Sequence, residues 1–360
     1  MTLRKLTYLF ATLGLSIGFS SCDRKEDVAD ETISVYVAFN YDSITPNREV
    51  IHCGAIWNDG NIIKLSSGRE DVYVYDVYMS PHGDLYAAGN FDKNPLYWKN
   101  GEEHILTSGR AATGIGILNG KVYCCGYNTN NYVGDQAMMW VDGEAQELKY
   151  GSRCNRLCIG NGKCYIAGYG EREMDGEIKE DALVWENGKP MSPLAQSKSG
   201  VDNYASANDV VCGDAVWIVG REKANTASWL PKVWVDYTHN NLTSAGMDSR
   251  LNAIVFENGT YYIAGNDGLK ATYWTATQKS KTERRPANVK SVVLADKTPQ
   301  QSTVSDIAVI DGNVYCVGYT RLADNYQPKL WVNGKDENFA FPKSYSNVVP
   351  QSIVLVKKEK

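Results

Sequence analysis

Two adjacent cysteines, Cys124 and Cys125, lie in the stretch KVYCCGY and raise three possibilities: a redox pair, half of a metal site, or two small apolar side chains. When the repeats described below are aligned, the same positions elsewhere hold apolar residues: Ala87, Ile166, Ile218, Ile263 and Cys316 for the first, and Ala88, Ala167, Val219, Ala264 and Val317 for the second. Free cysteine behaves as a small hydrophobic residue, and neighbouring strand residues point to opposite faces. We therefore expect both cysteines, and Cys164 by the same alignment, to be buried in the walls of the fold.

The other candidates for metal or disulfide chemistry show no diagnostic spacing. The histidines are far apart, and none has a second ligand at helical or hairpin spacing: His52, His82, His104 and His239. An exported protein could form disulfides, but no spacing pairs the less regular cysteines, which are Cys53, Cys154, Cys158 and Cys212. Segment 170–181 holds six carboxylates that do not follow a calcium-loop pattern, so a solvated hairpin is favoured. The sequence predicts neither a metal nor a cofactor.

A repeat of roughly forty residues organises the chain. Each unit has an apolar run ending in Gly, a variable loop, an aromatic strand ending in Trp, and a turn, as in NVYCVGYTRLADNYQPKLWVNGKDENF. Seven of the nine tryptophans occupy the Trp position: Trp57, Trp98, Trp140, Trp185, Trp234, Trp274 and Trp331. Four short strands in such a period are typical of a β-propeller blade.

Two-residue turns join the strands within each repeat. Asn-Gly and Asp-Gly are favoured there because both central residues adopt positive φ. They occur between the first and second strands at Asn119-Gly120, Asn161-Gly162, Asn258-Gly259 and Asp311-Gly312. They occur between the third and fourth strands at Asp59-Gly60, Asn100-Gly101, Asp142-Gly143, Asn187-Gly188 and Asn333-Gly334.

One repeat is split between the two ends of the chain. ISVYVAFN, CGAIWNDG and IIKL supply three strands near the N-terminus, and PQSIVLVKK at the C-terminus supplies the missing first strand. The sequence therefore predicts an all-β fold over residues 31–360: a seven-bladed β-propeller of four-stranded antiparallel blades. Its closing blade combines one C-terminal and three N-terminal strands, which removes exposed strand edges.

The strand order separates two faces. The turn face carries the two-residue turns. The long-loop face is expected to carry the longer connections: 41–52, 127–137, 169–181, 221–231, 281–304 and 319–328. Loops on a rigid scaffold are where binding residues concentrate, so the long-loop face is the candidate working surface.

Two sets of polar residues are expected around the channel mouth on the long-loop face. The first ring follows the second strand of each repeat and consists of Asn40, Asn90, Tyr127, Tyr169, Arg221, Asn266 and Tyr319. The second ring begins the first strand and consists of Asp76, Thr113, Asn155, Asn208, Asn252, Ser305 and Gln351. The first ring could read a sugar or a peptide, with its tyrosines and arginine contributing most. The second ring is more typical of residues that hold loops through local hydrogen bonds.

Three arginines precede the first strand of their repeats: Arg110, Arg153 and Arg250. They could attract an anionic ligand, although stacking on neighbouring aromatic rings is the favoured interpretation. For catalysis, only His52 among the histidines and Asp76 in the second ring are expected on the long-loop face. No Gly-x-Ser-x-Gly elbow, phosphate loop or Ser-x-Asp-x-Gly-x-Thr-Trp box occurs. A binding or scaffold module is therefore favoured, with a polysaccharide lyase or hydrolase acting at the channel mouth as the alternative.

The N-terminus reads as a targeting segment. MTLRK is basic, and LTYLFATLGLSIGF is apolar but too short to span a membrane. It ends in FSSC, which resembles a bacterial lipobox, so residues 1–21 are expected to be a lipoprotein signal peptide. The resemblance implies lipidation at Cys22, and residues 22–30 then form a flexible tether. The expected location is the outer membrane, on its periplasmic or its external side.

The net charge of −5 argues against nucleic acid as a partner. The pattern apolar-Tyr-x-x-Gly, variable loop, Tyr/Leu-Trp-x-Asn-Gly resembles that of repeat lipoproteins of Gram-negative gut bacteria, over essentially the whole mature chain. The resemblance implies a propeller at the cell envelope and transfers no catalytic residue. We expect a monomer that contacts the membrane only through its lipid and binds a glycan or an envelope protein.

Overall fold

The computed structural model describes residues 32–45, 47–65, 71–130, 134–195, 203–224, 228–242, 249–294, 301–323 and 325–358. These residues are strands and their connections, which confirms the all-β class. Within them, no helix has the length and hydropathy needed to cross a bilayer. The expected signal peptide, Cys22 and the tether lie outside the described residues.

Four sheets of consecutive antiparallel strands follow the repeat. The first contains β4 (Val72–Met79), β5 (Leu85–Phe91), β6 (Asn94–Lys99) and β7 (Glu102–Ile105). The second contains β8 (Ala111–Leu118), β9 (Lys121–Asn130), β10 (Gly134–Val141) and β11 (Glu144–Glu147). The third contains β20 (Arg250–Glu257), β21 (Thr260–Asp267), β22 (Lys270–Thr277) and β23 (Ala287–Val293). The fourth contains β24 (Ser302–Ile310), β25 (Asn313–Arg321), β26 (Tyr326–Val332) and β27 (Lys335–Glu337).

A larger sheet joins two further repeats. Its first half contains β12 (Arg153–Gly160), β13 (Lys163–Met174), β14 (Glu177–Glu186) and β15 (Lys189–Pro190). Its second half contains β16 (Asn203–Cys212), β17 (Val216–Ala224), β18 (Leu230–Val235) and β19 (Thr238–Asn241). All pairings within each half are antiparallel, and the halves meet through one parallel pairing, between Glu180 of β14 and Tyr204 of β16.

The remaining sheet combines the two ends of the described chain. Its order is β28 (Tyr345–Lys358), β1 (Thr32–Ile44), β2 (Val50–Asn58) and β3 (Asn61–Lys64). The antiparallel register of β28 on β1 runs from the pair of Thr32 and Lys358 to the pair of Ser43 and Tyr345. One C-terminal strand and three N-terminal strands therefore share this sheet, as the split repeat predicts.

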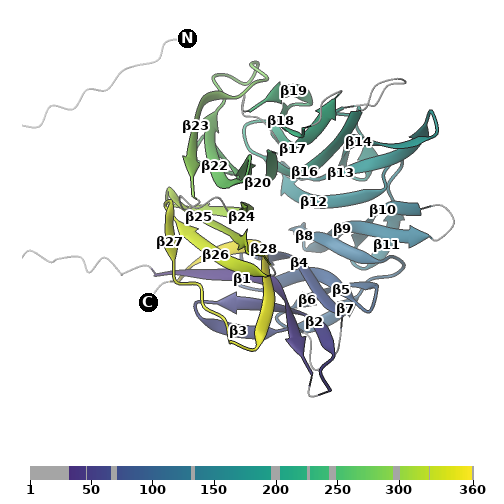
Figure 1. The fold of residues 1–360 in the computed structure, drawn as a ribbon. Coiled ribbons are helices and arrows are strands. Elements are labelled where there is room, and N and C mark those ends of the chain that lie inside the picture. Colours follow the sequence, from purple (N-terminus) through teal and green to yellow (C-terminus); the bar gives the residue numbers. More distant parts are fainter. Residues whose placement is uncertain are drawn as a thin grey trace, which may run out of the picture.

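The sheets are arranged around a common centre, with β28 in yellow beside β1 in purple (Figure 1). The innermost strands contact one another in the order β4, β8, β12, β16, β20, β24 and β28, and β28 contacts β4 in turn. This cycle of first strands surrounds the site described below.

The repeat tryptophans form the packing layer between sheets. All seven lie on the third strand of their repeat and are at most 7% exposed. Several also donate a hydrogen bond from the indole nitrogen, as from Trp140 Nε1 to the carbonyl oxygen of Thr107 at 2.7 Å. A large buried ring stabilises each interface, and in Trp140, Trp185 and Trp234 the indole N–H adds a hydrogen bond.

The repeat glycines face a bulge in the neighbouring strand. Each innermost strand is interrupted by a register shift, as between Ala112 and Gly114 of β8. In six repeats a Cβ on the second-strand glycine would lie 1.9–2.1 Å from a carbonyl oxygen of the first strand, as at Gly126 opposite Ala111. At these six positions only glycine fits beside the bulge.

The nine expected two-residue turns are confirmed, because both residues of each have positive φ. The first residue also stabilises the sheet through its side chain. Asn187 Oδ1 accepts a hydrogen bond from the backbone nitrogen of Cys164, and Asn333 Oδ1 accepts one from Val314, both at 2.9 Å. The turns therefore use Asn or Asp for conformation and for this capping bond.

Several of the expected long connections are partly wrong, because cross-strand pairing extends into them, as it does in 41–52 and 127–137. Connection 169–181 is an extension of β13 and β14, joined at Asp175-Gly176, because cross-strand pairing continues to Met174 and Glu177. This confirms the hairpin interpretation of the acidic segment. Connection 281–304 contains β23, whose pairing with β22 continues the sheet. Residues 278–286 therefore join a third strand to a fourth and belong by topology to the turn face.

The cysteine interpretation is confirmed. Cys124 and Cys125 are fully buried and belong to different hydrophobic clusters, so the two thiols lie in separate walls. Cys164 is buried in the same cluster as Cys125. Burial raises the pKa of each of these thiols, so none is prepared to act as a thiolate. The eight cysteines of the described residues are free thiols.

Candidate functional site

A cavity of about 490 Å³ lies at the centre of the long-loop face, and we call it the mouth cavity. Each of the seven innermost strands contributes at least one lining residue. Six are second-ring residues: Thr113, Asn155, Asn208, Asn252, Ser305 and Gln351. The prediction that these side chains gather around one opening is therefore confirmed for all of the second ring except Asp76.

The placement of Asp76 in the second ring is wrong by one residue. The bulge residue of β4 is Tyr75, which lines the mouth cavity. Asp76 follows the bulge, as Arg156, Asp209 and Asp306 do in their strands. Because strand residues alternate in direction, this single step moves the side chain from the mouth into the channel.

The bulge residues hold neighbouring strands together. Asn155 Nδ2 donates to the carbonyl oxygen of Ala207, and Asn208 Nδ2 donates to that of Leu251, both at 2.7 Å. Asn252 forms the equivalent bond in the next sheet, also at 2.7 Å. The loop-holding interpretation of the second ring is thus supported by bonds between neighbouring repeats. The same side chains line the cavity, so these bonds also fix their positions there.

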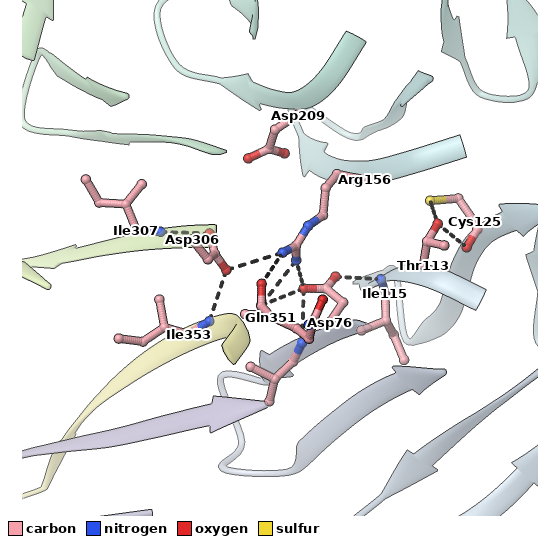
Figure 2. Close-up of polar contacts among 12 residues, drawn as sticks. Asp76, Thr113, Ile115, Cys125, Arg156, Asp209, Asp306, Ile307, Gln351 and Ile353 are labelled. Atoms are coloured by element: carbon pink, nitrogen blue, oxygen red, sulfur yellow. Dashed lines mark hydrogen bonds and ion pairs between the residues drawn. The ribbon is translucent and has the colours of Figure 1, made fainter. Parts of the chain in front are cut away.

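An ion cluster closes the channel beneath the mouth cavity. Arg156 of β12 forms ion pairs with Asp76 of β4 and, at 3.5 Å, with Asp306 of β24 (Figure 2). Ser352 Oγ donates to Asp76 Oδ1 at 2.9 Å, and Arg156 Nη2 donates to the carbonyl oxygen of Gln351 at 3.0 Å. We call the four residues Asp76, Arg156, Asp209 and Asp306 the central ion cluster.

Each aspartate of this cluster joins two innermost strands. One carboxylate oxygen accepts from the backbone nitrogen of the following residue, and the other accepts from the next strand. The second donors are Ile115 for Asp76 at 3.0 Å, Ile254 for Asp209 at 2.9 Å, and Ile353 for Asp306 at 3.0 Å. The carboxylates are therefore occupied by structural bonds.

In the central ion cluster, burial and the neighbouring opposite charges shift the pKa values in opposite directions. Burial raises the pKa of Asp209 to about 7, and the opposite charge of Arg156 offsets this only in part. Burial also raises the pKa of Asp306, again against the influence of Arg156. For Arg156, burial acts to lower the pKa, but the nearby carboxylates outweigh it and the pKa lies above its usual range. Arg156 is therefore charged at neutral pH, whereas Asp209 is close to its midpoint.

A second cavity lies on the other side of the ion cluster. It has a volume of about 340 Å³ and is lined mainly by aliphatic residues of the innermost strands, among them Ile115, Ile254 and Ile353. Arg156 lines both this cavity and the mouth cavity. The cluster thus separates a polar chamber from a mainly apolar one.

The first ring does not form one continuous surface. Arg221, Asn266 and Tyr319 line the mouth cavity. Asn90 and Tyr127 instead line a side cavity of about 430 Å³, together with Arg110 and His52. Asn40 and Tyr169 line neither cavity.

The side chain of Asn40 has a structural task. Its amide exchanges two hydrogen bonds of 2.9 Å with the backbone of Val74 on the neighbouring sheet.

Burial raises the pKa of Tyr169 to about 12, although Arg153 acts to lower it. Tyr127 and Tyr169 thus do not line the mouth cavity with Arg221 and Tyr319, contrary to the expectation from aligned positions.

The three arginines before the first strands have different surroundings. Arg153 lies 4.3 Å over the ring of Tyr127 and forms an ion pair with Asp135, which confirms the stacking interpretation for that residue. Arg110 lines the side cavity. Arg250 is exposed and lines the mouth cavity, where Arg221 also lies.

The structure does not assemble the two residues considered for catalysis. His52 Nδ1 lies 2.7 Å from Asp42 Oδ1 at the side cavity, whereas Asp76 is held in the central ion cluster. Among the described residues, no group of three or more His, Cys, Asp and Glu side chains is placed to hold a metal ion.

The sequence interpretation missed Arg156, Asp209 and Asp306. A usable signal was present, because Tyr75-Asp76-Val77, Asn208-Asp209-Val210 and Ser305-Asp306-Ile307 share one pattern. Aligning these three aspartates would have placed Asp76 one position later and revealed the ring of carboxylates. Arg156 occupies the same position after Asn155.

No family model matches the chain, and no curated protein matches it. Among solved structures, it is similar to the β-propeller domain of the Trilobed protease from Pyrococcus furiosus, with a TM-score of 0.51 and 13% identity over 86% of this chain and 93% of that one. It is also similar to an acylaminoacyl peptidase of Pyrococcus horikoshii, with a TM-score of 0.50 and 13% identity over 85% of this chain and 51% of that one.

A puromycin-hydrolyzing peptidase of Mycobacterium tuberculosis matches with a TM-score of 0.50 and 11% identity, over 87% of this chain and 53% of that one. The chain thus spans about half the length of the two peptidases. At these identities the likeness extends to the fold alone, and the fold of this chain is a β-propeller.

Proposed function

We propose that this protein is a seven-bladed propeller that binds a glycan or a protein partner in its mouth cavity. The seven blades are the five four-stranded sheets and the two halves of the eight-stranded sheet, with the sheet of β28 and β1–β3 closing the ring. The cycle of contacts among the seven innermost strands supports this count.

The observation that carries the binding proposal is the lining of the mouth cavity. Fourteen of its fifteen lining residues are polar, and they come from all seven proposed blades. The volume of about 490 Å³ lies in the range of small-ligand sites, roughly 300–1,000 Å³. Because the bulge amides are fixed by bonds to neighbouring strands, the lining is rigid before any ligand arrives.

The proposal includes a cellular setting that follows from the N-terminal sequence. A signal peptide over residues 1–21, lipidation at Cys22 and a tether over 22–30 would place a monomeric propeller at the outer membrane. The membrane contact would be the lipid alone, which leaves the mouth cavity free for a partner.

The test compares variants of the two faces. The purified protein would be screened on a glycan array and in pull-downs from envelope extracts, and the ligand found would be titrated against each variant. Arg221→Ala and Tyr319→Ala should each weaken binding by about 1–3 kcal/mol without unfolding the protein. Asn187→Ala and Asn333→Ala on the turn face should lower stability and leave affinity unchanged. Loss of binding in the turn-face pair alone would show that the wrong face was chosen.

The alternative is an enzyme acting on a polysaccharide at the same mouth. Asp76 is engaged by Arg156 and two backbone donors, which leaves it poorly suited to proton transfer. Turnover of a polysaccharide by the purified protein, abolished by Asp76→Asn or His52→Ala, would replace the binding proposal with this one.

A further inference from the structure

We infer that the ligand of the mouth cavity is an acidic saccharide, whose carboxylate or sulfate group is bound by Arg221 and Arg250. This inference rests on the proposed function, because it names the ligand class of the same cavity. The protein as a whole has a net charge of −5, so a positive cavity is a local departure from its overall balance.

The charged residues of the cavity carry the inference. Among the described residues, its charged lining consists of Arg156, Arg221 and Arg250, and no carboxylate lines it. Arg156 is already neutralised by the aspartates of the central ion cluster. Arg221 and Arg250 therefore supply the uncompensated positive charge.

The guanidinium groups of Arg221 and Arg250 lie near each other, and no anionic side chain lies between them in the described lining of the cavity. Within the described part of the chain, neither forms an ion pair or a side-chain hydrogen bond. Arg221 lies 4.1 Å over the ring of Trp229, which fixes its plane without using its N–H groups. Burial lowers the pKa of Arg221, and the like charge of Arg250 lowers it further. An anion placed between them would relieve this repulsion and occupy their N–H groups.

One carboxylate lies near enough to act on Arg221. Glu180 of β14 raises the pKa of Arg221, while burial raises the pKa of Glu180 itself. Glu180 does not line the mouth cavity, so it offsets part of the charge of Arg221 without occupying the cavity, and the described lining offers no carboxylate to Arg250.

The uncharged lining favours a saccharide over a peptide. Among the described residues, Val349 is the only aliphatic one that lines the cavity, whereas a peptide site normally offers apolar pockets for anchor side chains. Asn155 and Asn252 use their amide nitrogens to hold the next strand, and no described residue donates to their carbonyl oxygens. Such oxygens accept hydrogen bonds from sugar hydroxyls, and the rings of Tyr75 and Tyr319 offer apolar faces for a sugar ring.

The experiment measures binding by isothermal titration calorimetry with purified protein. The probes are trigalacturonate, its fully methyl-esterified form, an oligosaccharide terminated by glucuronate, and a sulfated disaccharide. The ester retains the sugar hydroxyls and removes the charge, so the comparison isolates the anionic group. At least one acidic probe should bind, at least ten times more tightly than its neutral counterpart. Raising sodium chloride from 50 to 500 mM should weaken binding several-fold.

Matched variants locate the charge. Arg221→Gln and Arg250→Gln should each weaken binding of the acidic probe at least tenfold. Arg285→Gln removes the same charge from the turn face, where the residue pairs with Glu283, and should leave binding unchanged. The melting temperatures of the three variants provide the check on folding.

Three results would overturn the inference. They are equal affinity for the acid and its ester, unchanged affinity in both mouth variants, and failure of every acidic probe to bind. If a neutral saccharide binds and Tyr319→Ala weakens it while the arginine variants do not, the mouth remains the binding site and only the charge inference fails. If a peptide binds through its carboxylate and no acidic sugar does, the ligand is a protein segment and the saccharide class is wrong.

Discussion

Replacing Arg156 by Met tests the central ion cluster directly. Met has a similar length but no charge, so Arg156→Met leaves Asp76, Asp209 and Asp306 facing one another. At an effective dielectric constant of 20, two unit charges 3.5 Å apart interact by roughly 5 kcal/mol, and Arg156 has two such partners. The desolvation of Arg156, whose side chain is 16% exposed, offsets part of this gain. Removing one partner of a buried pair costs about 3–5 kcal/mol, which for a domain of this size corresponds to a melting temperature lower by roughly 4–7 °C.

The effect of Arg156→Met should depend on pH. Burial raises the pKa of Asp209 to about 7, above its ordinary value of 3.8, so the folded protein takes up a proton between those values that the unfolded chain does not. Stability contributed by this group therefore rises as the pH falls from about 8 to 5. In the variant, Asp209 and Asp306 lose a positive neighbour, and their pKa values should rise further. Each additional unit recovers about 1.4 kcal/mol at low pH, so the variant should be less destabilised at pH 5 than at pH 8.

The assay is thermal unfolding followed by tryptophan fluorescence at pH 5 and pH 8. Arg285→Met, which breaks a surface pair with Glu283, provides the control and should change the melting temperature little at either pH. Adding Asp76→Asn to Arg156→Met should restore part of the loss, because it removes one of the unpaired charges. The electrostatic account of the cluster would be refuted if Arg156→Met had the same melting temperature as the wild type at pH 8. It would also be refuted if the variant lost the same stability at both pH values.

Four further predictions address the rest of the molecule. Deleting residues 350–360 should remove most of the strand that pairs with β1 and cause aggregation; a truncated protein of unchanged solubility and melting temperature would contradict the closing sheet. Gly126→Ala should destabilise the fold by about 1–3 kcal/mol or more, measured by urea unfolding, because a Cβ has no space beside the bulge. A hydrogen bond with His239, together with a neighbouring lysine, lowers the pKa of Glu222 to about 2, so Glu222→Gln should lower the melting temperature at pH 7 and hardly change it at pH 2. Cys22→Ala should abolish palmitate labelling and partition into detergent; retention of both would show that lipidation occurs elsewhere.

The propeller fold could be predicted because its signals are local and repeated. Each Trp, each second-strand glycine and each Asn-Gly turn responds to a constraint within one sheet or between neighbours, and that constraint recurs along the chain. The pairing of β28 with β1 followed from counting strands within a repeat, since a missing first strand at one end matched a spare strand at the other.

The site was harder to predict because it depends on register at the bulges. A bulge adds one residue to an innermost strand, and a single step decides whether a side chain enters the mouth or the channel. Asp76 was placed wrongly for this reason, and Arg156 was overlooked although its neighbour Asn155 was included. The division of the first ring between two cavities could not be read from aligned positions. Arg153 stacks over the ring of Tyr127, and the alignment does not show this contact between neighbouring repeats.

The pairing of β28 with β1 gives the order of synthesis a structural meaning. Among the described strands, β1 is made first and β28 last, so one edge of β1 has no partner until β28 has been translated. Contacts between such distant segments form late, because the intervening chain must first be ordered. An incomplete chain therefore differs from a complete one by an open strand at its beginning, which is the kind of edge that chaperones and proteases encounter in unfinished proteins. The arrival of β28 thus determines whether β1 is protected.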